Sequence, residues 1–156
     1  MKIILAVSQD GYIADKNGCI PWKLSHDMKW FKMNTFNSTI GMGRKTWESL
    51  PRQLAHRHHV ILTKSPKLFS FDDDVEQTAS MKQFKQTLEL QHGWVIGGAD
   101  VAKQCFRRGA ILVLTTVFVH VGEGTHIDIP LKQTLWQSKI FIEGGVRFRY
   151  GIYQLL

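Results

Sequence analysis

The chain has 156 residues, 44% of them hydrophobic and 21% charged, which is the composition of a folded globular protein and excludes a disordered chain. Twenty Lys and Arg residues against 13 Asp and Glu residues give a formal net charge of +7, which favours an anionic partner: a nucleotide, a polyacidic small molecule or a nucleic acid. We expect neither a membrane span nor a signal peptide, because Asp10 and Gly11 interrupt the N-terminal apolar run and no other run approaches ~20 residues.

Strands and helices are predicted to alternate over most of the chain. Residues 2–8 form a continuous β-branched apolar run, as expected of a strand that is covered on both faces. Ser25 and Ser80 are each placed to cap a helix, because a serine hydroxyl accepts a hydrogen bond from the first turn. In chain order the predicted elements are strand 2–8, a helix from the Ser25 cap to about 36, strand 38–43, helix 44–50, strand 59–63, helix 81–90, strand 94–98, helix 99–108, strand 110–119 and a hairpin over 138–156.

This order predicts a single α/β domain over residues 1–156. Strands that alternate with helices give a mostly parallel sheet, and a C-terminal hairpin turning at Gly144 and Gly145 adds an antiparallel edge. In open α/β sheets, ligands bind at the carboxyl ends of the strands. The residues that directly follow each predicted strand are therefore where ligand-binding side chains are expected.

Three strand ends carry residues that suit a phosphate. Gly43 ends one strand before "RKT" opens a helix, which offers free backbone N–H groups and two cations, although a solvated helix start explains the pattern equally well. The second is "VIGGAD", whose glycine pair allows close backbone approach but lacks the full GxGxxG pattern. Lys64 and Ser65 follow the third strand, where a surface lysine is the usual explanation.

Asp27 is the sharpest single signal. It borders the apolar stripe of its helix, four residues before Phe31, instead of lying opposite that stripe. A first-turn acid that complements the helix dipole is the ordinary explanation. The preceding loop "NGCIPW" shifts the interpretation towards a ligand site, because it places Ile20 and Trp22 beside a glycine-punctuated segment able to fold over a ligand.

Metal and covalent chemistry are not expected. His56, His58 and His59 cluster in sequence, but neighbours in a strand point to opposite faces, and we interpret them as a basic surface patch. The two cysteines, Cys19 and Cys105, have no metal-binding or CxxC spacing, which favours free thiols and a cytoplasmic location.

Taken together, these motifs resemble dihydrofolate reductase in order and spacing over about residues 2–130: "LAVSQDGYIADKNGCIPWKLSHDMKWFK", "GMGRKTWESLP", "HVILT" and "VIGGADV". The resemblance implies a mostly parallel eight-stranded sheet with about four helices and an adenosine-binding subdomain at about 38–106. It also implies a monomeric enzyme that reduces 7,8-dihydrofolate to tetrahydrofolate with NADPH, and so supports one-carbon metabolism and the synthesis of thymidylate, purines and amino acids.

In the family pattern, Asp27 holds the amino and ring N–H edge of the pterin through a bidentate pair. Arg57 matches the arginine that pairs with the carboxylate of the glutamate tail. Asp27 and Trp22 would be catalytic, with Trp22 beside a mobile 9–24 loop that admits the water protonating N5 of the pterin. The substrate residues that the resemblance implies are Ala6, Val7, Asp27, Met28, Phe31, Leu54, Arg57, Ile96 and Thr115.

The cofactor pattern favours NADPH, because Lys64 and Ser65 fall where the 2′-phosphate is met and Gly97-Gly98 match a pair joined by a cis peptide. Ala102 and Asp100 depart from the family, which commonly has an aromatic and a basic residue there. The implied cofactor residues are Ala6, Ile13, Gly18, Ile20, Gly43, Arg44, Lys45, Thr46, Leu62, Thr63, Lys64, Ser65, Ile96, Gly97, Gly98, Ala99, Asp100, Val101, Ala102 and Thr125.

Three other functions remain open at this point. A related pterin or pyrimidine reductase would use the same sheet, although Asp27 and Arg57 together suit folate better. A basic nucleic-acid-binding protein would explain the charge but not the ordered glycine motifs. The third is a reductase fold that has lost its activity.

Burial is expected to raise the pKa of Asp27, since it disfavours the charged carboxylate. The dipole of the first turn opposes this increase, but by less than ~1 kcal/mol.

Overall fold

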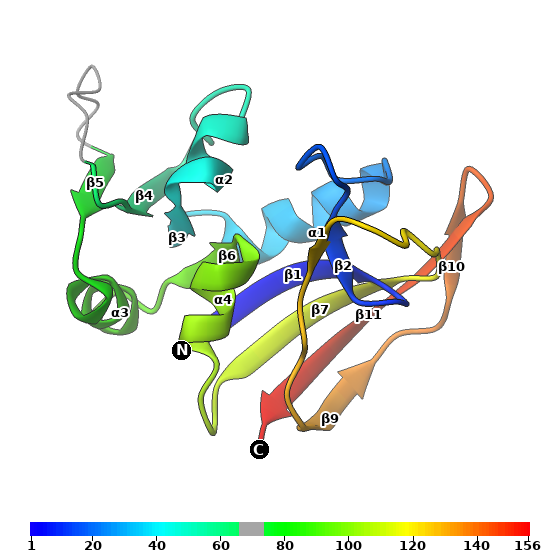
Figure 1. Cartoon of the computed structure of the whole chain (residues 1–156). Helices are drawn as coiled ribbons and strands as arrows, with labels where there is room; N and C mark the ends of the chain where they lie inside the picture. The colour runs from blue at the N-terminus through cyan, green and yellow to red at the C-terminus, as the bar shows by residue number, and fades with distance from the viewer. Residues whose placement is uncertain (66–73) are drawn as a thin grey trace.

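A computed structural model describes residues 1–65 and 74–156 of the chain. Within these residues one large sheet is flanked by four helices, and a two-stranded ribbon lies beside it (Figure 1). The helices are α1 (Ser25–Thr35), α2 (Arg44–Ser49), α3 (Met81–Leu90) and α4 (Ala99–Cys105). The strands are β1 (Lys2–Ser8), β2 (Tyr12–Ala14), β3 (Ser38–Gly43), β4 (Arg57–Leu62), β5 (Val75–Thr78), β6 (Trp94–Gly97), β7 (Ile111–Val117), β8 (Thr125–His126), β9 (Lys132–Gln137), β10 (Phe141–Glu143) and β11 (Val146–Leu155).

The sheet is mixed, with a parallel majority and an antiparallel C-terminal strand. Its order is β10-β11-β7-β1-β6-β3-β4-β5, and β9 pairs with the other half of β11. The neighbours from β7 to β5 are all parallel, whereas β11 runs antiparallel to β7. The predicted α/β class is therefore confirmed. The described strands fill eight positions in the sheet, because β9 and β10 share the edge position beside the long strand β11.

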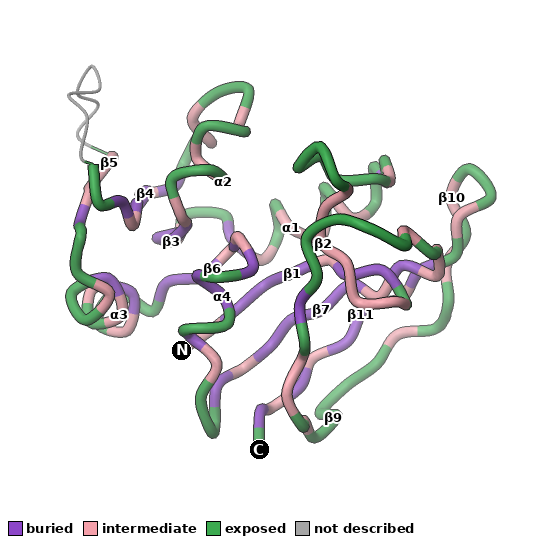
Figure 2. The backbone as a smooth tube through the Cα atoms, viewed as in Figure 1, coloured by how far each residue is buried: buried purple, intermediate pink, exposed green. Residues whose placement is uncertain are grey.

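Helices cover both faces of the sheet. On one face, Phe84 and Leu88 of α3 and Ala102 of α4 belong to one buried cluster, with α3 lying against β3 and β4 and α4 against β6. On the other face, Phe31 of α1 and Trp47 of α2 pack against the central strands. Buried positions follow the central strands, and β9 is exposed along its length (Figure 2). None of the helices in the described ranges is long and apolar enough to cross a membrane.

Several elements have the bounds that the sequence predicts. The run at 2–8 becomes β1, and 38–43 becomes β3. Ser80 caps α3 by accepting a hydrogen bond from the backbone N–H of Gln83 at 3.2 Å. The hairpin turns at Gly144 and Gly145, both with positive φ.

Other predicted bounds are corrected. Ser25 is the first residue of α1 instead of its cap, and the capping position is held by Leu24. The predicted strand at 59–63 begins two residues earlier, at Arg57. Helix α4 ends at Cys105 because Phe106 turns into extended backbone and packs against the core. The sequence did not predict β2, β5, β8 or β9.

The ribbon of β2 and β8 ties the loop before α1 to the segment after β7. Asp10 strengthens this tie, since its carboxylate accepts hydrogen bonds from the backbone N–H groups of Val121 and Gly122. A hydrogen bond from the Ser8 hydroxyl is the main cause that lowers the pKa of Asp10 to about 2, and these backbone bonds add to the decrease. At Gly124, where φ is +139°, an added Cβ would lie 2.2 Å from the carbonyl oxygen of Ala14, so the two segments touch through backbone.

Replacing Phe84 with Ala tests the packing of α3 on the sheet. The Phe84 side chain is 0% exposed, so we expect the free energy of unfolding to fall by about 3–5 kcal/mol in urea titrations. Leu90→Ala on the same helix is the matched control, because Leu90 is 82% exposed and should change stability by less than ~0.5 kcal/mol. Equal losses in the two variants would contradict the packing described here.

Candidate active site

The Asp27 carboxyl lies on the face of the sheet that α1 covers. It is half-buried in the first turn of α1, and its Oδ1 accepts a 2.6 Å hydrogen bond from Thr115 Oγ1. Thr115 belongs to β7 and lies opposite Ala6 of β1 in the parallel register. Three elements far apart in sequence therefore meet at this acid, and Ala6, Asp27 and Thr115 are brought together as the resemblance implies.

The environment of Asp27 favours its protonated form. Burial is the main cause that raises its pKa, and the negative charge of Glu143 adds to the increase, whereas the Thr115 hydrogen bond opposes it. A carboxyl with a raised native pKa binds its proton more tightly when folded. Its contribution to stability is therefore present below its unfolded pKa and is lost as pH rises through the native pKa. The acid costs stability at neutral pH, which points to a functional role.

Apolar side chains surround the acid. Phe31, Leu54 and Ile96 pack in one cluster on the α1 face, which supports their prediction as neighbours in one site. Met28 is 68% exposed beside them. Trp22 packs against a second cluster that holds Leu24 at the start of α1. The surroundings of Asp27 can therefore receive a flat, partly apolar ring system.

Arg57 is fixed at the far end of α1. Its side chain is 7% exposed and donates hydrogen bonds to the carbonyl oxygens of Ala55 (2.6 Å) and Lys32 (3.3 Å) and, from two nitrogens, to Thr35 Oγ1 (3.2 and 3.3 Å). These four bonds leave one N–H of Nη1 out of the five that a guanidinium carries. Burial lowers the pKa of Arg57. A carboxylate arriving here would meet a cation whose position is already set.

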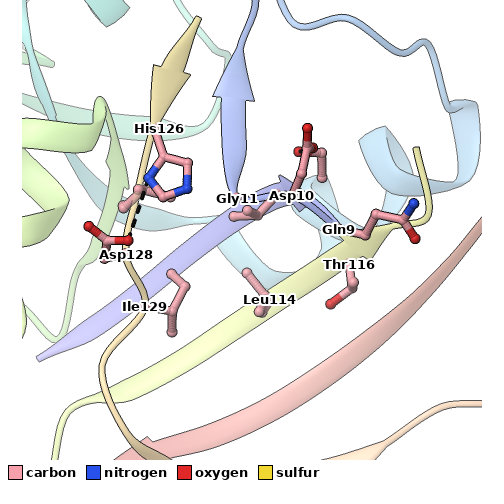
Figure 3. Close-up of a pocket in the computed structure, with 11 residues that line it drawn as sticks. Gln9, Asp10, Gly11, Leu114, Thr116, His126, Asp128 and Ile129 are labelled. Carbon is pink, nitrogen blue, oxygen red and sulfur yellow. Dashed lines mark hydrogen bonds and ion pairs between the residues drawn. The ribbon is translucent and has the colours of Figure 1, made fainter. Parts of the chain in front are cut away.

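The Val7 side chain lies on the opposite face of the sheet from Asp27, which corrects its predicted place in the substrate pocket. It packs with Leu5 and Leu114 and lines a cavity of about 410 Å³ whose rim includes His126 and Asp128 (Figure 3). Only the main chain of Val7 can reach the Asp27 side, because neighbouring strand residues point to opposite faces.

A second group of predicted residues gathers at the carboxyl ends of β3 and β6. The Gly97-Gly98 peptide bond is cis, as the resemblance implies. A Cβ on Gly43 would lie 3.0 Å from Val101 Cγ2, and one on Gly98 would lie 3.5 Å from Thr46 Oγ1. The starts of α2 and α4 therefore approach each other closely, and only a small residue fits at Gly43.

Gly43, Gly97 and Gly98 form what we call the glycine cradle, and the residues that flank it are basic and polar. Arg44, Lys45, Lys64 and Ser65 are exposed; Leu62 ends the neighbouring strand β4, and Thr63 follows it. Within α4, Asp100 is exposed. The cradle thus offers exposed cations on two sides of a surface made of backbone.

Three residues of α4 are buried beneath this surface. Ala99 and Val101 are 5% and 8% exposed, and the Val101 side chain packs close to Gly43. Ala102 is 0% exposed and packs in the core against the sheet. Because its side chain is enclosed in the core, a cofactor contact at Ala102 stays a prediction for its main chain alone.

The remaining predicted cofactor residues lie on the ribbon and the loop before α1. Ile13 in β2 packs against the core, and Thr125 in β8 is exposed. Gly18 and Ile20 are exposed in the loop. These four residues lie on segments that the β2-β8 pairing joins, which is a different part of the chain from the glycine cradle.

The histidine cluster differs from its prediction as a surface patch. His59 is 0% exposed, and burial lowers its pKa, so it is neutral and part of the interior. Its Nε2 accepts a hydrogen bond from the backbone N–H of Leu54 at 3.2 Å, which shapes the segment before β4. Among the described residues no group of three or more His, Cys, Asp and Glu side chains is arranged to hold a metal ion.

Sequence reasoning missed two residues that face Asp27. Glu143 ends β10 and binds the start of α1, and Tyr150 in β11 lies opposite Thr115. The pKa of Tyr150 is raised to about 12, first by burial and then by the negative charges of Asp27 and Glu143. Both residues follow Asp27 by more than a hundred positions, and no local pattern marks them.

Comparison with known proteins agrees with this geometry. The sequence profile of the family described as dihydrofolate reductase matches residues 1–143. The chain belongs to the dihydrofolate reductase family. This finding confirms the family and the enzyme class that the sequence motifs predict.

Relatives in the dihydrofolate reductase family come from several lineages. One named dihydrofolate reductase, from Buchnera aphidicola subsp. Baizongia pistaciae, is 33% identical over 126 residues, covering 81% of this chain and 76% of that protein. Dihydrofolate reductase HdrB of Haloferax volcanii is 34% identical over 131 residues, with 78% and 68% coverage. Dihydrofolate reductase type 9 of Escherichia coli is 32% identical over 138 residues, with 84% and 77% coverage.

Replacing Thr115 with Val tests the electrostatics of Asp27. The hydrogen bond from Thr115 favours the charged carboxylate, so its loss should raise the pKa of Asp27 further, by about one unit. A ¹³C NMR titration of the Asp27 carboxyl measures this. Thr116→Val on the opposite face of β7 is the control and should leave the titration unchanged. An unchanged or lowered Asp27 pKa in Thr115→Val would show that the bond does not act on the carboxylate.

Proposed function

We propose that this protein reduces 7,8-dihydrofolate to 5,6,7,8-tetrahydrofolate with NADPH. The observation that carries the proposal is the half-buried Asp27 carboxyl, held by Thr115 and surrounded by apolar side chains. Membership of the family supports the same reaction. As a reductase of this kind, it would supply tetrahydrofolate to one-carbon metabolism.

Asp27 suits the pterin because one carboxylate can accept two parallel hydrogen bonds. The amino group and the neighbouring ring N–H of the pterin form such a pair of donors. Thr115 already occupies one lone pair of Oδ1, which fixes the plane of the carboxylate before a ligand arrives. Phe31 and Ile96 would then contact the faces of the ring, and Arg57 would meet the carboxylate of the tail with its remaining N–H.

The glycine cradle fits the dinucleotide. Gly43 and Gly98 let backbone approach a ligand without side chains between them, and Arg44, Lys45 and Lys64 are exposed for its phosphates. When bound, NADPH supplies the hydride that passes from nicotinamide C4 to C6 of the pterin. Strands β6, β3 and β4 lie side by side, so the adenosine part would bind the half of the sheet formed by residues 38–106.

The protein must also provide for a proton on N5 of the pterin. Asp27 binds the far edge of the ring in this arrangement, so a water carries the proton, and Asp27 favours the protonated pterin through its charge and hydrogen bonds. Trp22 packs at the start of α1 and borders the loop that would admit this water. The charge of Asp27 forms as pH rises through its raised pKa, so the step depends on pH above the ordinary titration range of a carboxyl group.

The decisive test of the reaction is Asp27→Asn. We expect kcat/KM for dihydrofolate at neutral pH to fall by about 100-fold or more, since the amide cannot accept both pterin hydrogen bonds. The measurement is the decrease of absorbance at 340 nm with NADPH and dihydrofolate. Asp128→Asn, on the opposite face and exposed, is the control. A wild-type protein that binds NADPH but does not oxidise it with dihydrofolate would refute the substrate assignment.

Cofactor choice is tested by Lys64→Gln. If Lys64 meets the 2′-phosphate, its loss should raise KM for NADPH about tenfold and leave KM for NADH unchanged, because NADH lacks that group. Lys82→Gln on α3 is a control of equal charge change, since Lys82 is exposed away from the cradle. An equal rise for both cofactors would place the phosphate elsewhere.

A further inference from the structure

The start of α1 has an unusual cap. An α-helix leaves the N–H groups of its first turn without partners, and a serine, threonine, aspartate or asparagine at the capping position normally accepts one of them. In this chain that position is held by Leu24, whose apolar side chain cannot accept a hydrogen bond. The helix that carries Asp27 therefore needs an acceptor from another part of the protein.

Glu143 is that acceptor. It ends β10, 118 residues along the chain from Ser25, and its two oxygens receive three hydrogen bonds from the first turn. Oε2 accepts the backbone N–H of Ser25 at 2.6 Å, and Oε1 accepts the Ser25 hydroxyl and the backbone N–H of His26, each at 3.0 Å. The His26 ring nitrogen Nδ1 also contacts Oε1. The backbone bonds are the main cause that lowers the pKa of Glu143 to about 2, so the cap is an anion at working pH.

The hairpin that carries Glu143 is firmly placed against α1. Phe141 of β10 pairs with Phe148 of β11, and their rings stack with centroids 5.9 Å apart. Tyr150 on the same strand stacks on Trp30 of α1 at 4.4 Å. The carboxylate therefore reaches the helix start from a rigid surface that contacts α1 at a second point one turn further along.

The same hairpin faces the catalytic acid. Asp27 follows Ser25 by two residues, in the turn that Glu143 holds, and the charges of Asp27 and Glu143 both raise the pKa of Tyr150. Glu143 and the Thr115 hydroxyl thus approach this turn from two different strands. Glu143 holds the backbone of the two residues that precede Asp27, and Thr115 holds the Asp27 side chain.

We propose that Glu143 is a positioning residue for Asp27: its carboxylate caps α1 from outside the helix and fixes the first turn so that the acid presents its free oxygen to the substrate. The charged and titratable groups around this contact are His26 and Asp27 on α1, Glu143 on β10 and Tyr150 on β11. Removing the negative charge of Glu143 should therefore also stabilise the charged form of Asp27. The kinetic consequence rests on the proposed function, but the structural consequence does not.

The test compares Glu143→Ala and Glu143→Gln with the wild type. The Ala variant should exchange the amide protons of Ser25 and His26 more than tenfold faster, and kcat/KM for dihydrofolate should fall about tenfold while KM for NADPH is unchanged. In both variants the pKa of Asp27, from its ¹³C NMR titration, should fall by about half a unit. The Gln variant retains an oxygen acceptor and should recover most of the lost kcat/KM.

Glu89→Gln is the matched control. Glu89 lies on α3, away from Asp27, and the substitution removes the carboxylate that pairs with Arg107 at 2.7 Å. Wild-type values in both Glu143 variants for amide exchange and for the Asp27 titration would overturn the proposal, as would equal changes in the control. If Glu143→Ala fails to fold, Glu143→Gln decides the matter through the titration alone. A wild-type protein without dihydrofolate turnover would refute the proposed reaction, while exchange and titration would still test the role of Glu143.

Discussion

The hydrogen bond between Thr115 and Asp27 joins the helix of the site to the centre of the sheet. Thr115 lies in β7 between β1 and β11, and both neighbours contribute to the surroundings of the acid. An acid here is unfavourable for folding at neutral pH, because burial favours its neutral form and Glu143 repels its charge. The protein retains it by fixing α1 from several directions, which is the arrangement expected where stability is given up for binding and catalysis.

The cofactor end of the site depends on a different constraint, the parallel order of β6, β3 and β4. Parallel neighbours bring their carboxyl ends, and the starts of the helices that follow, to one edge of the sheet. At that edge Gly43 and Gly98 leave room for a ligand where side chains would otherwise meet. One sheet thus presents a single acid among apolar side chains beside a basic cradle, which suits a neutral ring system reacting with a phosphorylated cofactor.

The sequence predicted what local patterns determine. Strand β1 follows from an apolar run, and α3 from its period and the Ser80 cap, and Asp27 was identified from its place beside an apolar stripe. What depends on tertiary contacts was missed or wrong: Ser25 does not cap α1, because Glu143 from a distant strand does. His59 was assigned to a surface patch and Ala102 to the cofactor site, but the side chains of both are buried, and burial is set by packing that no spacing reveals. The two- and three-residue strands β8 and β2 are too short to show a period.

The most direct test of the account is the pH dependence of hydride transfer in single turnovers, measured by stopped flow from pH 5 to 9 with NADPH and with NADPH deuterated at the transferred position. We expect a primary isotope effect and a rate that falls as pH rises, because fewer pterin rings then carry the N5 proton that the charge of Asp27 stabilises. A rate that is independent of pH across this range, or one without an isotope effect at any pH, would contradict the role given to Asp27.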